Sequence, residues 1–171
     1  IISGLVGSEM CIRDRGCLLT WGIGPDWDES FFAEFAEAFG ATLLTYNIDL
    51  WGGDTVRATT PFISVCVHGI GRKHDLLSRS GAREGEVVYV SGTIGDGFLG
   101  LQAFGTMTDA DAVSAYAAPT PQLALGQALA GIASACIDVS DGLAADLDHI
   151  CRASQISMDI EAAAVPLSAA G

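Results

Sequence analysis

Segments with the pattern of a helix and segments with the pattern of a strand alternate along this chain, and this alternation limits its fold most. Phe31, Phe35 and Phe39 recur four residues apart, which predicts a helix with one core-facing side that Gly40 closes. Residues 63–67 alternate between apolar and polar side chains, as a half-buried strand does. Helices and strands in alternation predict an α/β or α+β fold.

The remaining elements are placed by the same patterns and by turn residues. Asp26 or Asp28 is expected to cap the first helix, and Ser140 or Asp141 the last one, which has Leu143, Leu147 and Ile150 on one face. Loops are predicted at residues 52–55 and 140–142. Further strands are predicted at residues 42–46, 86–92, 136–139 and 157–161, and further helices from Phe98, over 109–117 and over 121–135.

The charge of the chain excludes several classes of partner. It has 21 acidic and 8 basic side chains and a formal net charge of -13. Nucleic acid is excluded as a direct partner because its phosphates need a basic face, and anionic lipid is disfavoured for the same reason. No stretch reaches the roughly 20 apolar residues of a membrane span. Five cysteines without a C-x-x-C pair predict a reduced, cytoplasmic protein.

The first 15 residues are interpreted as non-native sequence. They follow neither a helical nor a strand period, and residues 9–15 resemble the translation of a transposon-end sequencing adapter. The chain begins with Ile and ends without a helix stop, so we expect both ends to be cut. Four cations around Gly81 mark a domain boundary, which divides the rest into residues 16–72 and 73–171.

Three short acidic loops follow predicted strands, at residues 52–55, 95–97 and 138–142. An Asp beside Gly exposes its carboxylate and lets a ligand approach the backbone, and Mg²⁺ prefers such oxygen ligands. The alternative interpretation of any one loop is an ordinary Asp-Gly turn. A calcium hand starting at Asp138 is excluded, because its sixth residue is Leu143 and its twelfth is His149.

No other active-site pattern is present. The sequence has no G-x-x-x-x-G-K-[ST] loop, and Ser140 has no G-x-S-x-G setting. His68, His74 and His149 have no recognisable metal spacing. We therefore assign no side chain as a catalytic acid, base or nucleophile.

Four motifs, in order and spacing, resemble the thiamine-monophosphate kinase family, which belongs to the aminoimidazole ribonucleotide synthetase-like superfamily. The resemblance covers residues 16–168. The motifs are Gly52-Gly53-Asp54-Thr55-x-Arg57, Val67-His68-Gly69, Ser78-Arg79-Ser80-Gly81-Ala82 with Val88-Tyr89-Val90-Ser91-Gly92-Thr93-x-Gly95-Asp96, and Ile137-Asp138-Val139-Ser140-Asp141-Gly142-Leu143-x-x-Asp146-Leu147-x-His149-Ile150.

The resemblance implies direct, in-line transfer of the γ-phosphoryl group of ATP to thiamine monophosphate, which gives thiamine diphosphate. Such catalysis is mostly positioning and charge neutralisation by metal ions. By position, Asp54, Asp138 and Asp141 would ligate Mg²⁺. The residues that would contact ATP are Gly53, Asp54, Arg79 and Ser140. Asp96 is a weaker candidate and is interpreted as a turn residue.

The resemblance also implies a two-domain α/β fold and a homodimer formed through a β-barrel of the N-terminal domains. Residues 16–72 would be the C-terminal half of the N-terminal ATP- and Mg²⁺-binding domain, and residues 73–171 the first part of the C-terminal domain. Only the inner halves of both domains would then be present, so we expect this fragment to be inactive and poorly soluble. Two alternatives stay open: another ATP-using superfamily member, such as a synthetase or a hydrogenase-maturation protein, or a non-catalytic nucleotide- or metal-binding module.

Overall fold

The computed structural model describes residues 13–72, 76–105 and 110–168, apart from the side chains of residues 13–15, 110 and 111. The chain divides into two compact units, which separate between Arg72 and Lys73. The assignment of residues 16–72 and 73–171 to halves of two family domains stays a prediction. His74 lies outside the described residues.

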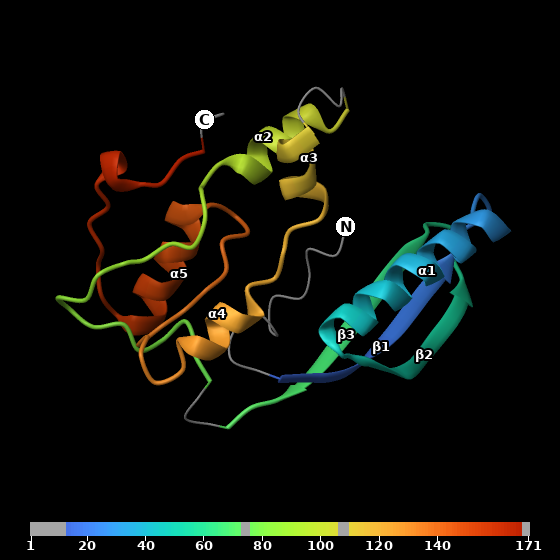
Figure 1. Cartoon of the computed structure of the whole chain (residues 1–171), viewed down its shortest axis with the longest axis horizontal. Coiled ribbons are helices and arrows are strands. Elements are labelled where there is room, and N and C mark those ends of the chain that lie inside the picture. Colours follow the sequence, from blue (N-terminus) through green and yellow to red (C-terminus); the bar gives the residue numbers. More distant parts are fainter. Residues whose placement is uncertain (1–12, 73–75, 106–109, 169–171) are drawn as a thin grey trace. The chain divides into compact units, whose positions relative to one another are not determined.

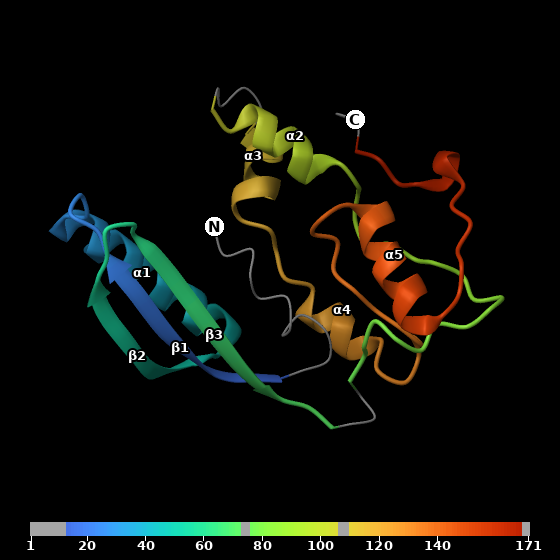
Figure 2. The same ribbon diagram turned by 180° about the vertical axis from the view of Figure 1, so that it is seen from behind.

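The unit before this division is a three-stranded sheet with one helix. Its elements are β1 (Arg13–Ile23), α1 (Glu29–Tyr46), β2 (Asp49–Arg57) and β3 (Phe62–Ile70). The strand order is β2-β1-β3, with β1 parallel to β2 and antiparallel to β3. Figures 1 and 2 show α1 along one face of this sheet. A helix that connects two parallel neighbours in this way forms a βαβ unit.

The core of this unit lies between α1 and the sheet. Cys17, Phe39 and Ile48 are buried there, and burial raises the pKa of the Cys17 thiol. Phe39 stacks on Phe35, and the Phe35 ring lies against Trp21 of β1. The core-facing row of phenylalanines is therefore confirmed. The partly buried side chains packed around this centre are Leu19, Phe35, Leu43, Tyr46, Val65 and Val67.

The opposite face of the sheet is exposed and carries large apolar side chains beside polar ones such as Thr20 and Asp54. Since successive strand residues alternate in direction, Leu18 points away from α1 while Cys17 and Leu19 point toward it. Trp51 lies over Gly16 and stacks on His68, and Phe62 lies over Gly22. Within this unit, no described helix covers this face.

The first helix is longer than the sequence pattern predicts. Asp28 is its N-cap, as one of the two candidates predicted, and its Oδ1 accepts the N–H of Phe31. Gly40 does not end the helix, and the predicted strand at residues 42–46 is wrong, because α1 continues to Tyr46. The hydroxyls of Thr42 and Thr45 donate to the carbonyls of the preceding helical turn, which satisfies two β-branched residues inside a helix. The predicted strand near Ile63 is confirmed as β3.

Two further expectations for this unit are corrected. Residues 52–55 are not a loop but part of β2, where they pair with residues 18–21 of β1. The sequence predicts no strand before the first helix, but β1 begins at Arg13 and so includes residues 13–15 of the segment interpreted as non-native. Backbone pairing needs no side-chain pattern, which is why this part of the strand leaves no sequence signal.

The other unit consists of short helices joined by extended segments. They are α2 (Asp96–Ala103), α3 (Ala110–Ala117), α4 (Leu123–Ala128), α5 (Leu143–Ser154) and the 3₁₀ turn η1 (Ala162–Ala164). Helices α2 and α3 pack closely, since a Cβ at Gly100 would lie 1.9 Å from the carbonyl oxygen of Ala112. The helix predicted over 121–135 is shorter than expected. None of the described helices is long and apolar enough to cross a membrane.

The strands predicted at residues 86–92, 136–139 and 157–161 are not formed. Among the described residues of this unit, strand pairing is limited to one bridge between Ile94 and Leu167. The Cys136 N–H donates to the Ser78 carbonyl at 2.9 Å, so the chain runs close to a neighbour there without a continuous ladder. These segments contain apolar and β-branched residues, which favour strands, but a strand also requires a partner of matching register.

Candidate functional site

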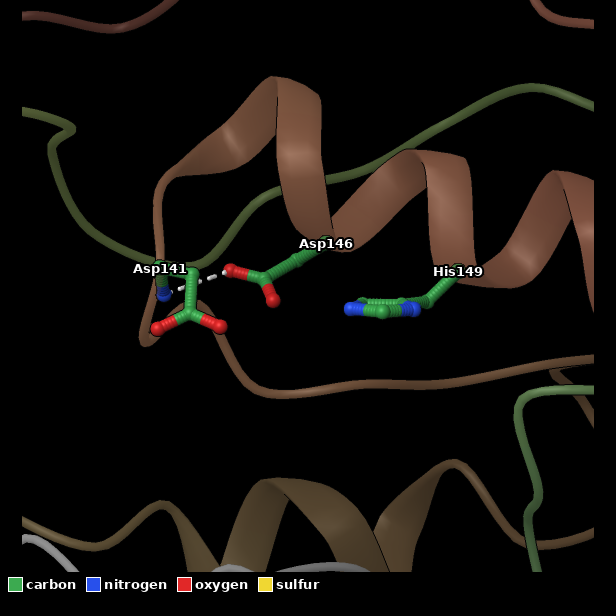
Figure 3. A group of neighbouring side chains, drawn as sticks. All are labelled: Asp141, Asp146 and His149. Carbon is green, nitrogen blue, oxygen red and sulfur yellow. Dashed lines mark hydrogen bonds between the residues drawn. The ribbon is translucent and has the colours of Figure 1, made fainter.

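The loop at residues 138–142 is held by the helix that follows it. Asp146, in the first turn of α5, is 2 % exposed. Its Oδ2 accepts the backbone N–H groups of Ser140 at 2.9 Å, Asp141 at 3.1 Å and Gly142 at 3.2 Å. Figure 3 shows the bond from Asp141. The loop therefore folds around a buried carboxylate.

This arrangement corrects the predicted cap of α5. Neither Ser140 nor Asp141 is the N-cap; that residue is Gly142, which has φ +114° and no side chain to accept a hydrogen bond. The turn needs a backbone conformation that L-residues with a side chain rarely adopt. The predicted cap is wrong because the stabilising carboxylate, that of Asp146, comes from inside the helix.

Asp141, Asp146 and His149 form a group that could hold a metal ion. Each offers one ligand atom, and these atoms all lie within 4.8 Å of one another. Asp141 and His149 are exposed, and Figure 3 shows both beside the Asp146 carboxylate. The sequence gives His149 no metal spacing, whereas the structure places it beside Asp141 and Asp146. The available signal was Asp146-x-x-His149, because residues three apart share one helix face.

Asp138 lies in the same neighbourhood but outside that group. It is partly buried, and loss of solvent raises the pKa of its carboxyl group. The nearby carboxylates of Asp146 and Asp141 raise this pKa further, while the Arg79 guanidinium opposes them. Three carboxylates and one cation thus interact here. This set of hard oxygen donors, with concentrated negative charge, fits Mg²⁺.

The segment that carries Arg79 is fixed to the far end of α5. The Ser154 Oγ accepts the N–H groups of Gly81 at 3.1 Å and Ala82 at 3.2 Å, and it donates to the Arg79 carbonyl at 3.3 Å. The Arg79 side chain is exposed. One helix therefore holds both loops, through Asp146 near its start and Ser154 at its end.

Gly53 and Asp54 lie in β2, in the unit before residue 73. Gly53 has φ +153° and pairs with Leu19, whose carbonyl oxygen would lie 1.6 Å from a Cβ at this position. Asp54 is exposed and its Oδ1 accepts the Thr55 N–H at 2.8 Å. Asp54 pairs with Thr20, which points to the same side of β1 as Leu18. Asp54 therefore lies on the sheet face opposite α1.

Asp96 is the first residue of α2 and follows Gly95, which has φ +104°. The neighbouring Ser168 hydroxyl and the hydrogen bond that Thr93 donates hold the pKa of its carboxyl group below the ordinary value. This local bonding agrees with its interpretation as a turn residue.

Known proteins match both units. The family profile for "AIR synthase related protein, C-terminal domain" matches residues 83–171. The thiamine-monophosphate kinase of Haemophilus influenzae is 39% identical over 150 residues, which cover 84% of this chain and 45% of that protein.

Two solved structures share the fold over most of the chain. The thiamine-monophosphate kinase of Stenotrophomonas maltophilia K279a matches with a TM-score of 0.84 and 31% identity, over 95% of this chain and 54% of that one. The structure of AaThiL complexed with AMPPCP and TMP matches with a TM-score of 0.87 and 25% identity, over the same shares. This chain spans about half the length of the relatives that it matches.

Proposed function

This chain belongs to the family of AIR synthase related proteins, and on that premise we propose that the complete protein carrying it transfers the γ-phosphoryl group of ATP to thiamine monophosphate. The product is thiamine diphosphate. The observation that carries the proposal is the match to AaThiL complexed with AMPPCP, an ATP analogue, and TMP. The identity to curated thiamine-monophosphate kinases supports the same acceptor.

The chemistry of the loops suits phosphoryl transfer. This reaction needs little covalent participation by the protein and depends on positioning and on neutralisation of phosphate charge. We infer that Asp54, Asp138 and Asp141 hold Mg²⁺, which when bound supplies that neutralisation. Arg79 presents a planar guanidinium that matches a phosphate group. The residues proposed to contact ATP are Gly53, Asp54, Arg79 and Ser140.

We also propose that the complete protein is a homodimer and works in the cytoplasm. The dimer is supported by the open face of the β2-β1-β3 sheet, where Leu18, Trp51, Val56 and Phe62 are 39%, 56%, 40% and 43% exposed. Apolar side chains gathered on one sheet face are typical of an interface. The cytoplasmic location rests on the cysteine pattern of the sequence. The exclusion of nucleic acid as a partner rests on the negative charge of the chain.

Assays of ATP-dependent thiamine diphosphate formation by the complete protein test this function. Wild type should require Mg²⁺, and Asp54→Asn and Asp141→Asn should each lower kcat by at least about 100-fold, since each removes a carboxylate ligand. Asp49→Asn, in the same strand as Asp54, and Asp159→Asn are matched controls and should retain wild-type kcat.

Two results would contradict the proposal. Preference of the wild type for a different phosphoryl acceptor would favour another ATP-using member of the superfamily. Nucleotide binding without turnover on any acceptor would favour a binding module. Wild-type kcat in both Asp54→Asn and Asp141→Asn would refute the assignment of these carboxylates as metal ligands, but would not contradict the kinase function.

A further inference from the structure

Asp146 is a buried charged side chain to which the proposed reaction assigns no direct role. It is 2 % exposed, and one of its oxygens accepts three consecutive N–H groups, from Ser140, Asp141 and Gly142. Successive N–H groups that converge in this way form a concave anion site in many proteins. Here that site is filled by a carboxylate of the same chain (Figure 3).

The three donors precede the helix, so this contact is not an ordinary cap. The N-cap Gly142 makes no side-chain hydrogen bond, and α5 begins at Leu143. The Asp146 N–H in turn donates to the Gly142 carbonyl at 3.0 Å. Asp146 thus holds the loop twice, through its side-chain carboxylate and through its backbone N–H. Charge-assisted hydrogen bonds are about twice as strong as neutral ones, so this contact fixes the loop more firmly than a hydroxyl could.

We propose that Asp146 is a positioning residue, which holds residues 140–142 in the shape that presents the Ser140 hydroxyl and the Asp141 carboxylate. The use of these two groups for ATP and Mg²⁺ rests on the proposed function. Because the Ser140 N–H already donates to Asp146, nucleotide contact at Ser140 falls to its hydroxyl. The loop therefore does not bind phosphate through its backbone as a P-loop does.

A competing role for Asp146 is direct metal ligation together with Asp141 and His149. The two roles differ in the protein without metal. A ligand contributes only when the ion is bound, whereas a positioning residue orders the loop before any ligand arrives. Exchange of the three loop amides, measured without metal, therefore separates the two roles.

The test follows hydrogen exchange of single amides by NMR in the complete protein, without metal or nucleotide. In Asp146→Asn the Ser140, Asp141 and Gly142 amides should exchange about tenfold faster, because a neutral acceptor replaces a charged one. Leu147 and Ile150, buried in the same helix, should change by less than about twofold. Asp148→Asn is the matched control, since Asp148 is exposed on α5 and pairs with Arg152.

Each outcome decides the matter. Unchanged loop exchange in Asp146→Asn overturns the proposal, and if Mg²⁺ affinity is lost as well, Asp146 is a ligand. Equal acceleration of loop and helix amides also overturns it, because Asp146 then stabilises the fold generally. Asp146→Ala should accelerate loop exchange more than Asn does. If the Ala variant does not fold, the Asn variant alone decides.

A second measurement connects the loop to the reaction. In Asp146→Asn the apparent Mg²⁺ affinity in the kinase assay should fall about tenfold and kcat should fall, while KM for thiamine monophosphate stays unchanged. Normal Mg²⁺ dependence despite a loosened loop would overturn the positioning role. If wild type does not use thiamine monophosphate, the proposed function fails, but the exchange experiment still tests whether Asp146 holds the loop.

Discussion

Gly53 is proposed to touch ATP, but its position in β2 already requires glycine. Its φ is +153°, and a Cβ there would lie 1.6 Å from the Leu19 carbonyl oxygen, which leaves no room for a side chain. Gly52 has a similar φ of +143° but open space around it. Gly53→Ala should therefore lower the free energy of unfolding by about 1–3 kcal/mol more than Gly52→Ala. Urea denaturation of both variants measures this, and equal losses would refute the steric argument.

At the level of single residues, the sequence predicts the acidic loop at 138–142 but not how it is held. Asp138 and Asp141 stand out because they flank Ser140, with Gly142 directly after them, at the end of an apolar segment. Asp146 and His149 belong to the fourth motif, but the sequence assigns them no role. They lie close to Asp141 because the loop turns back over the helix start, which Gly142 permits through its φ of +114°. Such a turn is a backbone property that composition alone does not specify.

At the level of elements, the start of α1 should depend on pH through Asp28. Hydrogen bonds from the Phe31 N–H and the Ser30 hydroxyl hold the pKa of this carboxyl group below its ordinary value. A lowered folded-state pKa stabilises the protein above the unfolded-state pKa, and that stability is lost as pH falls through the folded-state pKa.

Asp28→Ala should accordingly lower Tm at pH 7, and the gap from wild type should shrink as pH falls below the ordinary aspartate range. Thermal unfolding followed by circular dichroism between pH 7 and pH 3 measures the gap. Asp26→Ala is the control, because Asp26 is the exposed acid two residues earlier and is not the N-cap. A gap that stays constant with pH, or an equal gap for Asp26→Ala, would contradict the capping role.

The sequence predicts best those elements whose pattern is carried by their own side chains over a short stretch of chain. The phenylalanine row of α1 and the alternation in β3 are both of this kind. The errors lie where a distant partner decides. Residues 52–55 have the composition of a turn, yet pairing with β1 extends them. The extended segment at 86–92 has strand composition, yet the described residues pair it with no strand. Strand formation depends on context more than helix formation does.

At the scale of the whole molecule, strong acidity and an apolar sheet face occur in one chain. A net charge of -13 opposes association in general, so burial of the face that carries Leu18 must offset that repulsion in a dimer. A glutamate placed at the centre of this face would be buried without a partner, which costs several kcal/mol.

The complete protein should therefore sediment as a dimer at micromolar concentration, and Leu18→Glu should raise the dimer Kd by at least about 100-fold. Leu18 lies on the central strand β1 and is 39% exposed, so the fold of the single chain should tolerate the change. Leu44→Glu is the matched control, because Leu44 is 84% exposed on α1, away from the open face. A monomeric wild type would refute the dimer, and a dimer that survives Leu18→Glu but not Leu44→Glu would place the interface elsewhere.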